Sequence, residues 1–199
     1  MIVIKRYAAP PIRMDEILRY AAAKGGGEDV YALARECLAE AENNLSYSVC
    51  YREFPITHSE TGLDLSFCKI ESATLGKALG GCDRVIVFAA TIGLEMDRLI
   101  ARYSRLSPAK ALMLQAIGAE RIEALCDTFC RDLNAEYKGM LRPRVSPGYG
   151  DIPLSMQKEI FAVLDCSRKI GLSLNASLLM TPTKSVTAIV GIGDQHEHP

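Results

Sequence analysis

The chain has 199 residues, of which 49% are hydrophobic and 24% are charged, and its formal net charge is −1. Such a balance lacks the basic excess typical of proteins that bind nucleic acids or acidic membranes. No apolar run reaches the roughly 20 residues that a membrane helix needs, and the first residues lack the apolar stretch of a secretory signal. We therefore expect a cytoplasmic protein with a single domain, residues 1–199, and no nucleic-acid or membrane partner.

The seven cysteines are an odd number, and they include no Cys-x-x-Cys pair. This usage is typical of reduced thiols rather than of a disulfide framework. Cys126 and Cys130 are spaced like the start of an iron–sulfur signature, but Leu133 stands where the third cysteine would be. We expect these two thiols to lie one helical turn apart on a buried face.

The first part of the sequence predicts helices followed by strands. Apolar residues recur at helical spacing in 14–24 and again in 29–44, and a run of three glycines separates the two segments. Segments 47–56 and 63–70 are rich in strand-forming residues and are joined by a polar turn, which predicts a β-hairpin. A short helix is expected at 73–81.

The second part begins with a predicted buried strand at 84–91, because this segment is a short, continuous apolar run. Helices are expected at 94–106 and at 107–138. In the longer helix Ser107 suits the N-cap position and Pro108 the first helical position. The core-facing stripe of this helix comprises Ile122, Leu125, Phe129 and Leu133, at intervals of three and four residues.

A helix is predicted at 155–170, followed by β-like segments at 172–180 and 185–192. Helices and strands thus alternate without regular βαβ units. This order favours an α+β fold, with a mixed or antiparallel twisted sheet packed against several helices.

Acidic and histidine side chains predict neither a catalytic group nor a metal site. Glu123 and Asp151 are carboxylates without an evident catalytic partner in the sequence. His196 and His198 flank Glu197 and could ligate a metal, but a solvated terminal segment is the favoured interpretation. His58, in the predicted hairpin turn, is interpreted as a surface histidine.

Residues 142–153, RPRVSPGYGDIP, form the most constrained loop of the sequence. Loops rich in proline and glycine either separate helices or present a shaped backbone to a ligand. Within this loop, Arg144-Val145-Ser146-Pro147-Gly148-Tyr149 resembles the Arg-x-x-Pro-Gly-Tyr loop in the activation domain of cobalamin-dependent methionine synthase. Residues 170–182 and Ser185-Val186-Thr187 resemble that family's Gly-x-x-Leu-Thr-Glu-Ser segment and its Ser-Val-Ser strand.

The resemblance is strongest over residues 84–190, with a helical and hairpin part over 1–80, and it implies the activation domain fold and a site for S-adenosylmethionine. A planar guanidinium suits the carboxylate of the ligand's amino-acid tail, and an aromatic ring suits its sulfonium. The cofactor-binding residues that the resemblance implies are Arg144, Ser146, Pro147, Gly148 and Tyr149, with Glu123 on the preceding helix. The assignment of Glu123 depends on the alignment, since a shift of one residue would put Ala124 in its place.

The resemblance also implies a cobalamin carried by a partner, because the cobalt-ligating Asp-x-His-x-x-Gly motif is absent from this sequence. The partner would be a methionine synthase without its own activation domain or a related corrinoid protein, with a flavodoxin-like electron donor. Asn175 and Ala176 replace the family's threonine and glutamate, which puts any contact through that acidic side chain in doubt.

Three functions remain open at this point. The first is a free-standing module that presents S-adenosylmethionine for the reductive remethylation of cob(II)alamin, with no turnover without its partner. The second is a non-catalytic chaperone or activator of another corrinoid methyltransferase. The third is a stand-alone methyltransferase for a small acceptor, for which Glu123 and Asp151 are the only candidate bases.

Overall fold

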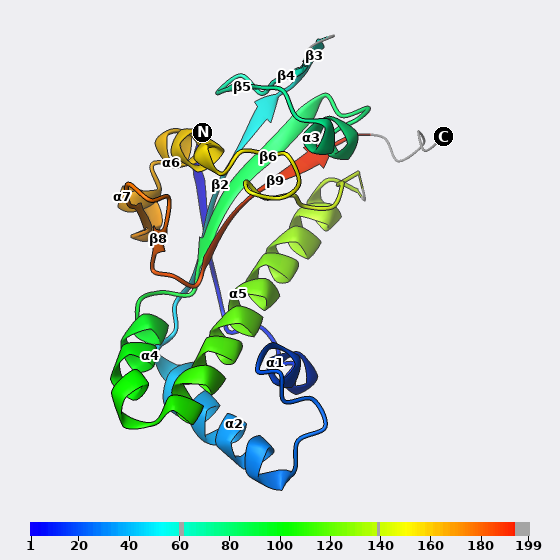
Figure 1. The fold of residues 1–199 in the computed structure, drawn as a ribbon. Helices are drawn as coiled ribbons and strands as arrows, with labels where there is room; N and C mark the ends of the chain where they lie inside the picture. The colour runs from blue at the N-terminus through cyan, green and yellow to red at the C-terminus, as the bar shows by residue number, and fades with distance from the viewer. Residues whose placement is uncertain (60–61, 139, 194–199) are drawn as a thin grey trace.

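A four-stranded antiparallel sheet with the order β1-β2-β6-β9 forms the centre of the computed structural model, which describes residues 1–59, 62–138 and 140–193. Its strands are β1 (Val3–Tyr7), β2 (Tyr47–Pro55), β6 (Arg84–Thr91) and β9 (Ser185–Ile192). Ser48 of β2 lies opposite Thr91 of β6, and Phe88 of β6 lies opposite Ala188 of β9. The antiparallel sheet and the surrounding helices confirm the expected α+β fold (Figure 1).

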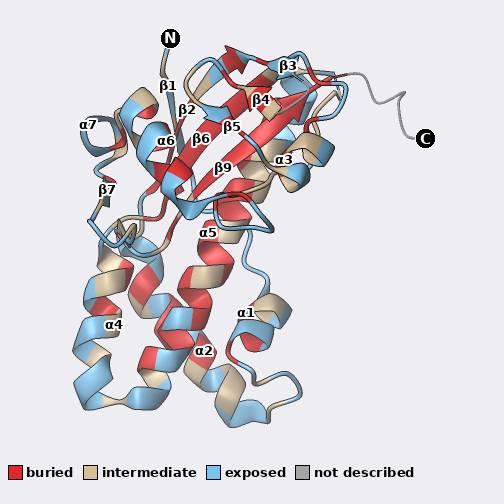
Figure 2. Ribbon diagram, turned by 45° about the horizontal axis from the view of Figure 1, so that its top comes forward, coloured by how far each residue is buried: buried red, intermediate tan, exposed pale blue. Residues whose placement is uncertain are grey.

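Helices cover both faces of this sheet. One face packs against α5 (Pro108–Glu136), and the other packs against α6 (Gln157–Leu164) and α7 (Cys166–Ile170). Strand β6, between β2 and β9, is buried along nearly its whole length (Figure 2). This burial on both faces explains why its sequence is a continuous apolar run rather than an alternating one.

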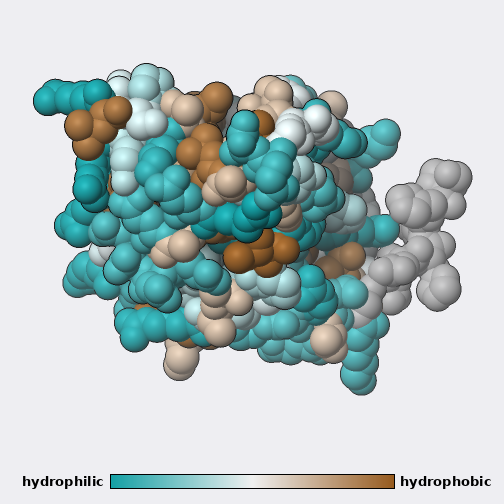
Figure 3. Space-filling model, turned by 90° about the horizontal axis from the view of Figure 1, so that it is seen from below, coloured by the Kyte–Doolittle hydropathy of each residue, from teal (hydrophilic) through white to brown (hydrophobic). Residues whose placement is uncertain are grey.

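The long helix α5 links the sheet to a helical end of the molecule. Its second half lies along the sheet, where the Phe129 ring is 4.8 Å from that of Phe88 and 5.2 Å from that of Tyr51. Its first half packs with α1 (Met14–Tyr20), α2 (Glu28–Ala41) and α4 (Glu95–Leu106). The predicted stripe of Ile122, Leu125, Phe129 and Leu133 is buried, as expected. Seen from this end, the surface is largely hydrophilic with scattered hydrophobic side chains (Figure 3).

Local signals determine the start of α5 and one close contact along it. The Ser107 hydroxyl caps the first turn by accepting a hydrogen bond from the Lys110 amide, as predicted. Gly118 lets the Lys184 and Met96 side chains approach the helix backbone, because a Cβ at this position would lie within 3 Å of both. Among the described residues, no helix is long and apolar enough to cross a membrane.

The expected hairpin between 47–56 and 63–70 is wrong. Both edges of β2 are taken by β1 and β6, so β2 has no free edge for the following segment. That segment instead forms a small separate sheet of three short strands, β3 (Thr57–Ser59), β4 (Gly62–Asp64) and β5 (Lys69–Ile70). A turn with Ser66 at φ +67° separates β4 from β5.

Other boundaries differ from the sequence pattern as well. The first strand, β1, was not predicted, and the first helix ends at Tyr20, just before Ala22 at φ +53°. The helix expected at 155–170 is broken at Asp165, whose φ is +51°, into α6 and α7. The remaining elements are α3 (Ala73–Ala78), β7 (Ser173–Leu174), β8 (Met180–Thr181), and the 3-10 turns Glu42–Asn44 and Leu154–Met156.

Candidate functional site

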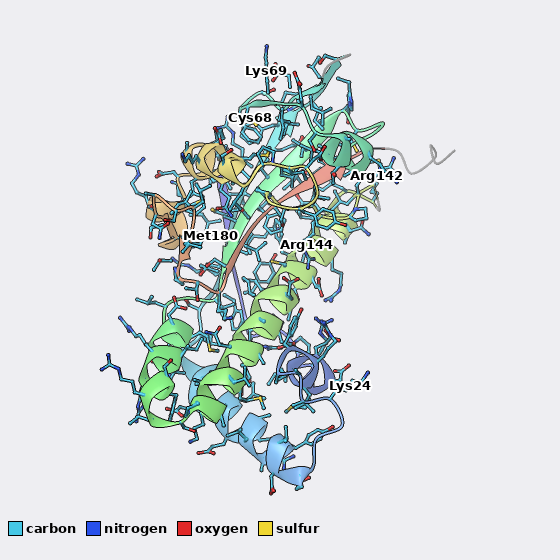
Figure 4. All side chains as sticks on the ribbon, viewed as in Figure 1. Lys24, Cys68, Lys69, Arg142, Arg144 and Met180 are labelled. Carbon is cyan, nitrogen blue, oxygen red and sulfur yellow. The ribbon has the colours of Figure 1, made fainter. Side chains whose placement is uncertain are left out.

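The constrained loop begins as an irregular extra strand on the outer edge of β9. Leu141 lies opposite Ile192 and Val145 opposite Ile189, and Val145 and Ile189 exchange two backbone hydrogen bonds of 2.9 and 2.8 Å. The two bridges are four residues apart in this segment but three apart in β9, so side chains do not alternate regularly between them. Arg144 bonds to carboxylates of α5, whereas the Nη2 of Arg142 donates to the Gly80 carbonyl at 3.4 Å. Both arginines lie beside the second half of α5, whereas Lys24 and Met180 lie in other parts of the molecule (Figure 4).

The Ser146–Tyr149 segment forms a tight turn that the sequence Pro-Gly predisposes. The Tyr149 amide donates to the Ser146 carbonyl at 3.1 Å, and Gly148 at the third position has φ +88°. Proline at the second position and a positive φ at the third are the pattern of a type II turn, in which glycine is favoured. The Gly148 amide also donates to the Ile152 carbonyl at 2.9 Å, so the backbone of the loop has a defined shape.

Asp151 holds the far end of the loop. Its carboxylate accepts hydrogen bonds from the Ser72 hydroxyl at 2.5 Å and from the backbone amides of Ala73 and Thr74 at 2.7 and 3.0 Å. These bonds to Ser72 and Thr74 hold the pKa of Asp151 below its ordinary value. Asp151 therefore anchors the loop to the start of α3 as an ionised acceptor, and it is not a candidate general base.

Arg144 is held between two carboxylates of α5. Its Nη2 donates to Glu123 Oε2 at 2.6 Å and its Nη1 to Asp127 Oδ1 at 2.8 Å. Glu123 and Asp127 are four residues apart, so they lie on the same face of the helix. Burial lowers the pKa of Arg144, but its hydrogen bonds to the two carboxylates outweigh this effect and raise the pKa above the ordinary value. The guanidinium is thus a permanent cation in a fixed position.

An open groove of about 620 Å³ adjoins this ion-pair cluster. It runs between the last turns of α5 and the extended part of the loop. Its lining residues are Cys130, Arg131, Asn134, Leu141, Arg142, Pro143, Arg144 and Val190. The groove therefore combines three arginines with an amide, a thiol and an apolar floor, a lining that suits a polar molecule bearing an anionic group.

A second arginine–carboxylate cluster lies further toward the N-terminus of α5. Arg121 is 2% exposed and pairs with Glu120, its fully buried neighbour, at 2.5 Å. Its Nη1 and Nη2 also donate to the carbonyls of Pro10 and Pro11 at 2.6 and 2.8 Å. Because every partner is supplied by the protein, this cluster fastens the N-terminal segment to α5.

The structure brings together some of the residues that the sequence pointed to. Glu123 and Arg144 are in direct contact, and Ala124, its alternative in the alignment, is buried. Ser146, Pro147 and Gly148 form the adjoining turn, and Tyr149 is 66% exposed, so its ring does not pack into the core. The ligand contacts assigned to these residues stay a prediction.

Two residues of the cluster were missed as site residues. Asp127 could have been found, because it lies one helical turn from Glu123 on the same face. Arg13, whose Nη2 lies 3.4 Å from Asp127 Oδ2, had no sequence signal, since 114 residues separate the two positions (127 − 13). Only the packing of the N-terminal segment on α5 brings Arg13 to this place.

Several other side chains have structural roles or lie outside the described residues. Cys126 is buried and Cys130 half-buried. His58 is exposed, and its Nε2 lies 2.8 Å from the Cys82 carbonyl. Asn175 accepts backbone hydrogen bonds from Ser177 and Leu179 within the β7–β8 connection. The prediction of a solvated segment at His196–His198 lies outside the described residues.

Comparisons with known proteins agree with the resemblance seen in the sequence. Residues 131–198 match the family model described as the activation domain of vitamin B12 dependent methionine synthase. The crystal structure of the MetH reactivation domain bound to AdoHcy superposes with a TM-score of 0.70 at 15% identity, covering 100% of this chain and 80% of that chain. No curated protein matches the sequence. The chain therefore has the fold of that reactivation domain along its whole length, and residues 131–198 are similar in sequence to the activation domain family of vitamin B12 dependent methionine synthase.

Proposed function

We propose that this protein binds S-adenosylmethionine and presents its methyl group to a cobalamin carried by a partner protein. The observation that carries the proposal is the fixed position of Arg144, between Glu123 and Asp127 and beside the Ser146–Tyr149 turn. Arg144 and the turn lie within the part of the chain that matches the family model. AdoHcy, the ligand of the structural neighbour, is what remains when S-adenosylmethionine loses its methyl group.

The chemistry of the cluster suits the amino-acid tail of such a ligand. The tail carries an ammonium and a carboxylate close together, so its site needs fixed charges of both signs. Glu123 and Asp127 offer carboxylate oxygens to the ammonium, and Arg144 offers its remaining N–H groups to the carboxylate. The backbone of Ser146, Pro147 and Gly148 is then available for the adenine edge.

Tyr149 has the exposure that contact with a sulfonium requires. Its ring is 66% exposed, beside a turn whose shape is defined by backbone hydrogen bonds. An aromatic face next to a cation stabilises it by about 0.5–2 kcal/mol. Within the proposal, Tyr149 therefore covers the sulfonium and stays accessible to the partner's cobalamin.

The protein's own part in the reaction is to bind and orient the donor. A reduced cobalamin on the partner would supply the nucleophile that accepts the methyl group, and this protein would hold the sulfonium donor before transfer and AdoHcy after it. A partner methionine synthase or related corrinoid protein and a flavodoxin-like electron donor belong to this proposal. We place the activity in the cytoplasm, since seven cysteines without paired spacing favour a reducing compartment.

The structure gives little support to a stand-alone methyltransferase, because such an enzyme needs a general base close to its acceptor. Asp151 is held ionised by its hydrogen bonds at the start of α3, and Glu123 is paired with Arg144. Methyl transfer to a nucleophile on a partner protein requires the donor and the nucleophile to be brought close together, and it does not require a general base on this protein. Presentation to a partner is therefore the function that the geometry supports best.

Calorimetric titration with S-adenosylmethionine tests the first half of the proposal. We expect the native protein to bind and Arg144→Ala to lose at least about tenfold in affinity, since hydrogen bonds to charged groups contribute about 1.5–3 kcal/mol. Arg168→Ala is the matched control, because Arg168 is exposed and pairs with Asp165, three residues away. Arg144→Lys keeps the charge and tests whether the planar guanidinium is needed.

A reconstitution tests the second half. A cobalamin-dependent methionine synthase without its activation domain would be mixed with this protein, a reductant and methyl-labelled S-adenosylmethionine. Label should enter the cobalamin only when both proteins are present. Consumption of S-adenosylmethionine without any corrinoid would contradict the proposal in favour of an independent methyltransferase. A native protein that does not bind the ligand would leave the chaperone function as the better explanation.

A further inference from the structure

Arg13, at the N-terminal end of α1, lies beside the same carboxylate that holds Arg144. Its Nη2 is 3.4 Å from Asp127 Oδ2, and its Nε is 3.7 Å from Glu120 Oε1. Its backbone amide donates to Glu120 Oε1 at 3.2 Å. Asp127 is therefore shared by two arginines, one that precedes α5 in the sequence and one that follows it.

The two arginines differ in how fully their donors are used. Arg144 makes two hydrogen bonds of 2.6 and 2.8 Å, and its side chain is 25% exposed. The Arg13 side chain is 45% exposed, and its guanidinium contacts of 3.4 and 3.7 Å lie beyond the usual length of a charge-assisted hydrogen bond. Arg13 thus retains more capacity to bind an incoming anion than Arg144 does.

The position of Arg13 is nevertheless well defined. The residues just before it, Pro10 and Pro11, are held through their carbonyls by the buried guanidinium of Arg121. The backbone amide of Arg13 is tied to Glu120. A cation on a fixed backbone loses less conformational entropy on binding a ligand than one on a free segment.

The charges along this side of α5 alternate in sign in the order Arg13, Asp127, Arg144, Glu123. We propose that Arg13 is a further ligand-binding residue, which holds the carboxylate of an amino-acid tail while Asp127 holds the neighbouring ammonium. This inference rests on the proposed function. It extends the site from α5 and the 142–153 loop to the N-terminal segment.

Two ligands that differ only in the carboxylate test whether Arg13 binds that group or affects ligand binding in a way that does not depend on it. S-adenosylmethionine and decarboxylated S-adenosylmethionine share the adenosine, the sulfonium and the ammonium. Both would be titrated by calorimetry into the native protein, Arg13→Gln and Arg13→Lys. Arg19→Gln is the matched control, because Arg19 is an exposed arginine of the same helix whose contacts with Glu16 and Tyr20 stay within that helix.

We expect Arg13→Gln to lower the affinity for S-adenosylmethionine about tenfold, as the loss of one charge-assisted hydrogen bond would. The affinity for the decarboxylated ligand should change less than twofold. Arg13→Lys should restore part of the lost affinity, and Arg19→Gln should behave like the native protein. Circular dichroism of each variant would verify that the fold is kept.

The inference and the proposed function fail in different ways. If the native protein binds and Arg144→Ala does not, an unchanged affinity in Arg13→Gln overturns the role of Arg13 and leaves the proposed function intact. An equal loss for both ligands also overturns it, since the effect would not depend on the carboxylate. A native protein that binds neither ligand overturns the proposed function and this inference together.

Discussion

Two arginine–carboxylate clusters on the same helix differ in what surrounds them. Arg121 and Glu120 are buried, and the N-terminal segment supplies the remaining acceptors for the guanidinium. Arg144, Glu123 and Asp127 are only half-buried, and Arg144 lines an open groove. Similar side chains thus serve as a structural fastening in one place and as a candidate binding site in the other, because only the second cluster has donors and acceptors within reach of solvent.

The comparison predicts that replacing Arg121 destabilises the protein much more than replacing Arg144. Arg121→Ala should lower the free energy of unfolding by about 3–5 kcal/mol, because it removes the buried counter-charge of Glu120 and leaves only the longer contact of 3.7 Å with the half-exposed Arg13. Arg144→Ala should cost about 1 kcal/mol or less, since water can reach the carboxylates it leaves behind. Urea denaturation of the two variants measures both values, and equal losses would break the distinction between the clusters.

Cys126 and Cys130 extend the comparison of buried and accessible side chains on α5 to thiols. Burial raises the pKa of both thiols, but Cys126 is fully buried whereas Cys130 lines the groove. With a maleimide reagent we expect Cys130 to react about tenfold faster than Cys126, because a buried thiol reacts only after local opening. Peptide mass spectrometry follows each site. Bound S-adenosylmethionine should slow the labelling of Cys130, and a rate unaffected by the ligand would argue against occupation of the groove.

The smallest expected effect concerns the anchor of the loop at Asp151. Asp151→Asn should lower the melting temperature at pH 7, because it removes the negative charge that accepts three hydrogen bonds at the start of α3. The pKa of Asp151 is depressed in the folded state. Its stabilising effect is therefore present above the unfolded-state pKa and is lost as the pH falls toward the folded-state value.

Melting curves between pH 7 and pH 3 test this dependence. The difference between native protein and Asp151→Asn should be largest near neutral pH and should shrink at the acidic end. Glu71→Gln is a suitable control, since Glu71 is an exposed carboxylate close to the same helix. A difference that grows on acidification would contradict the role of Asp151 as an ionised anchor.

The sequence alone predicted those elements whose signals are local. The cap at Ser107, the apolar stripe of α5 and the buried run of β6 each follow from residues adjacent in the chain or one helical turn apart. The same holds for the Pro147-Gly148 turn, because proline and glycine restrict or free the backbone dihedrals where they stand. The family resemblance was likewise contained in short, ordered motifs.

Strand pairing and the charge cluster were decided by the tertiary structure. The partner of β2 depends on which distant strands occupy its edges, and no turn signal between 47–56 and 63–70 reveals that competition. The proximity of Arg13 and Asp127 depends likewise on the packing of the N-terminal segment on α5. Contacts between residues so far apart carry no periodic or local pattern, so the sequence could name Arg144 and Glu123 but not the cluster that surrounds them.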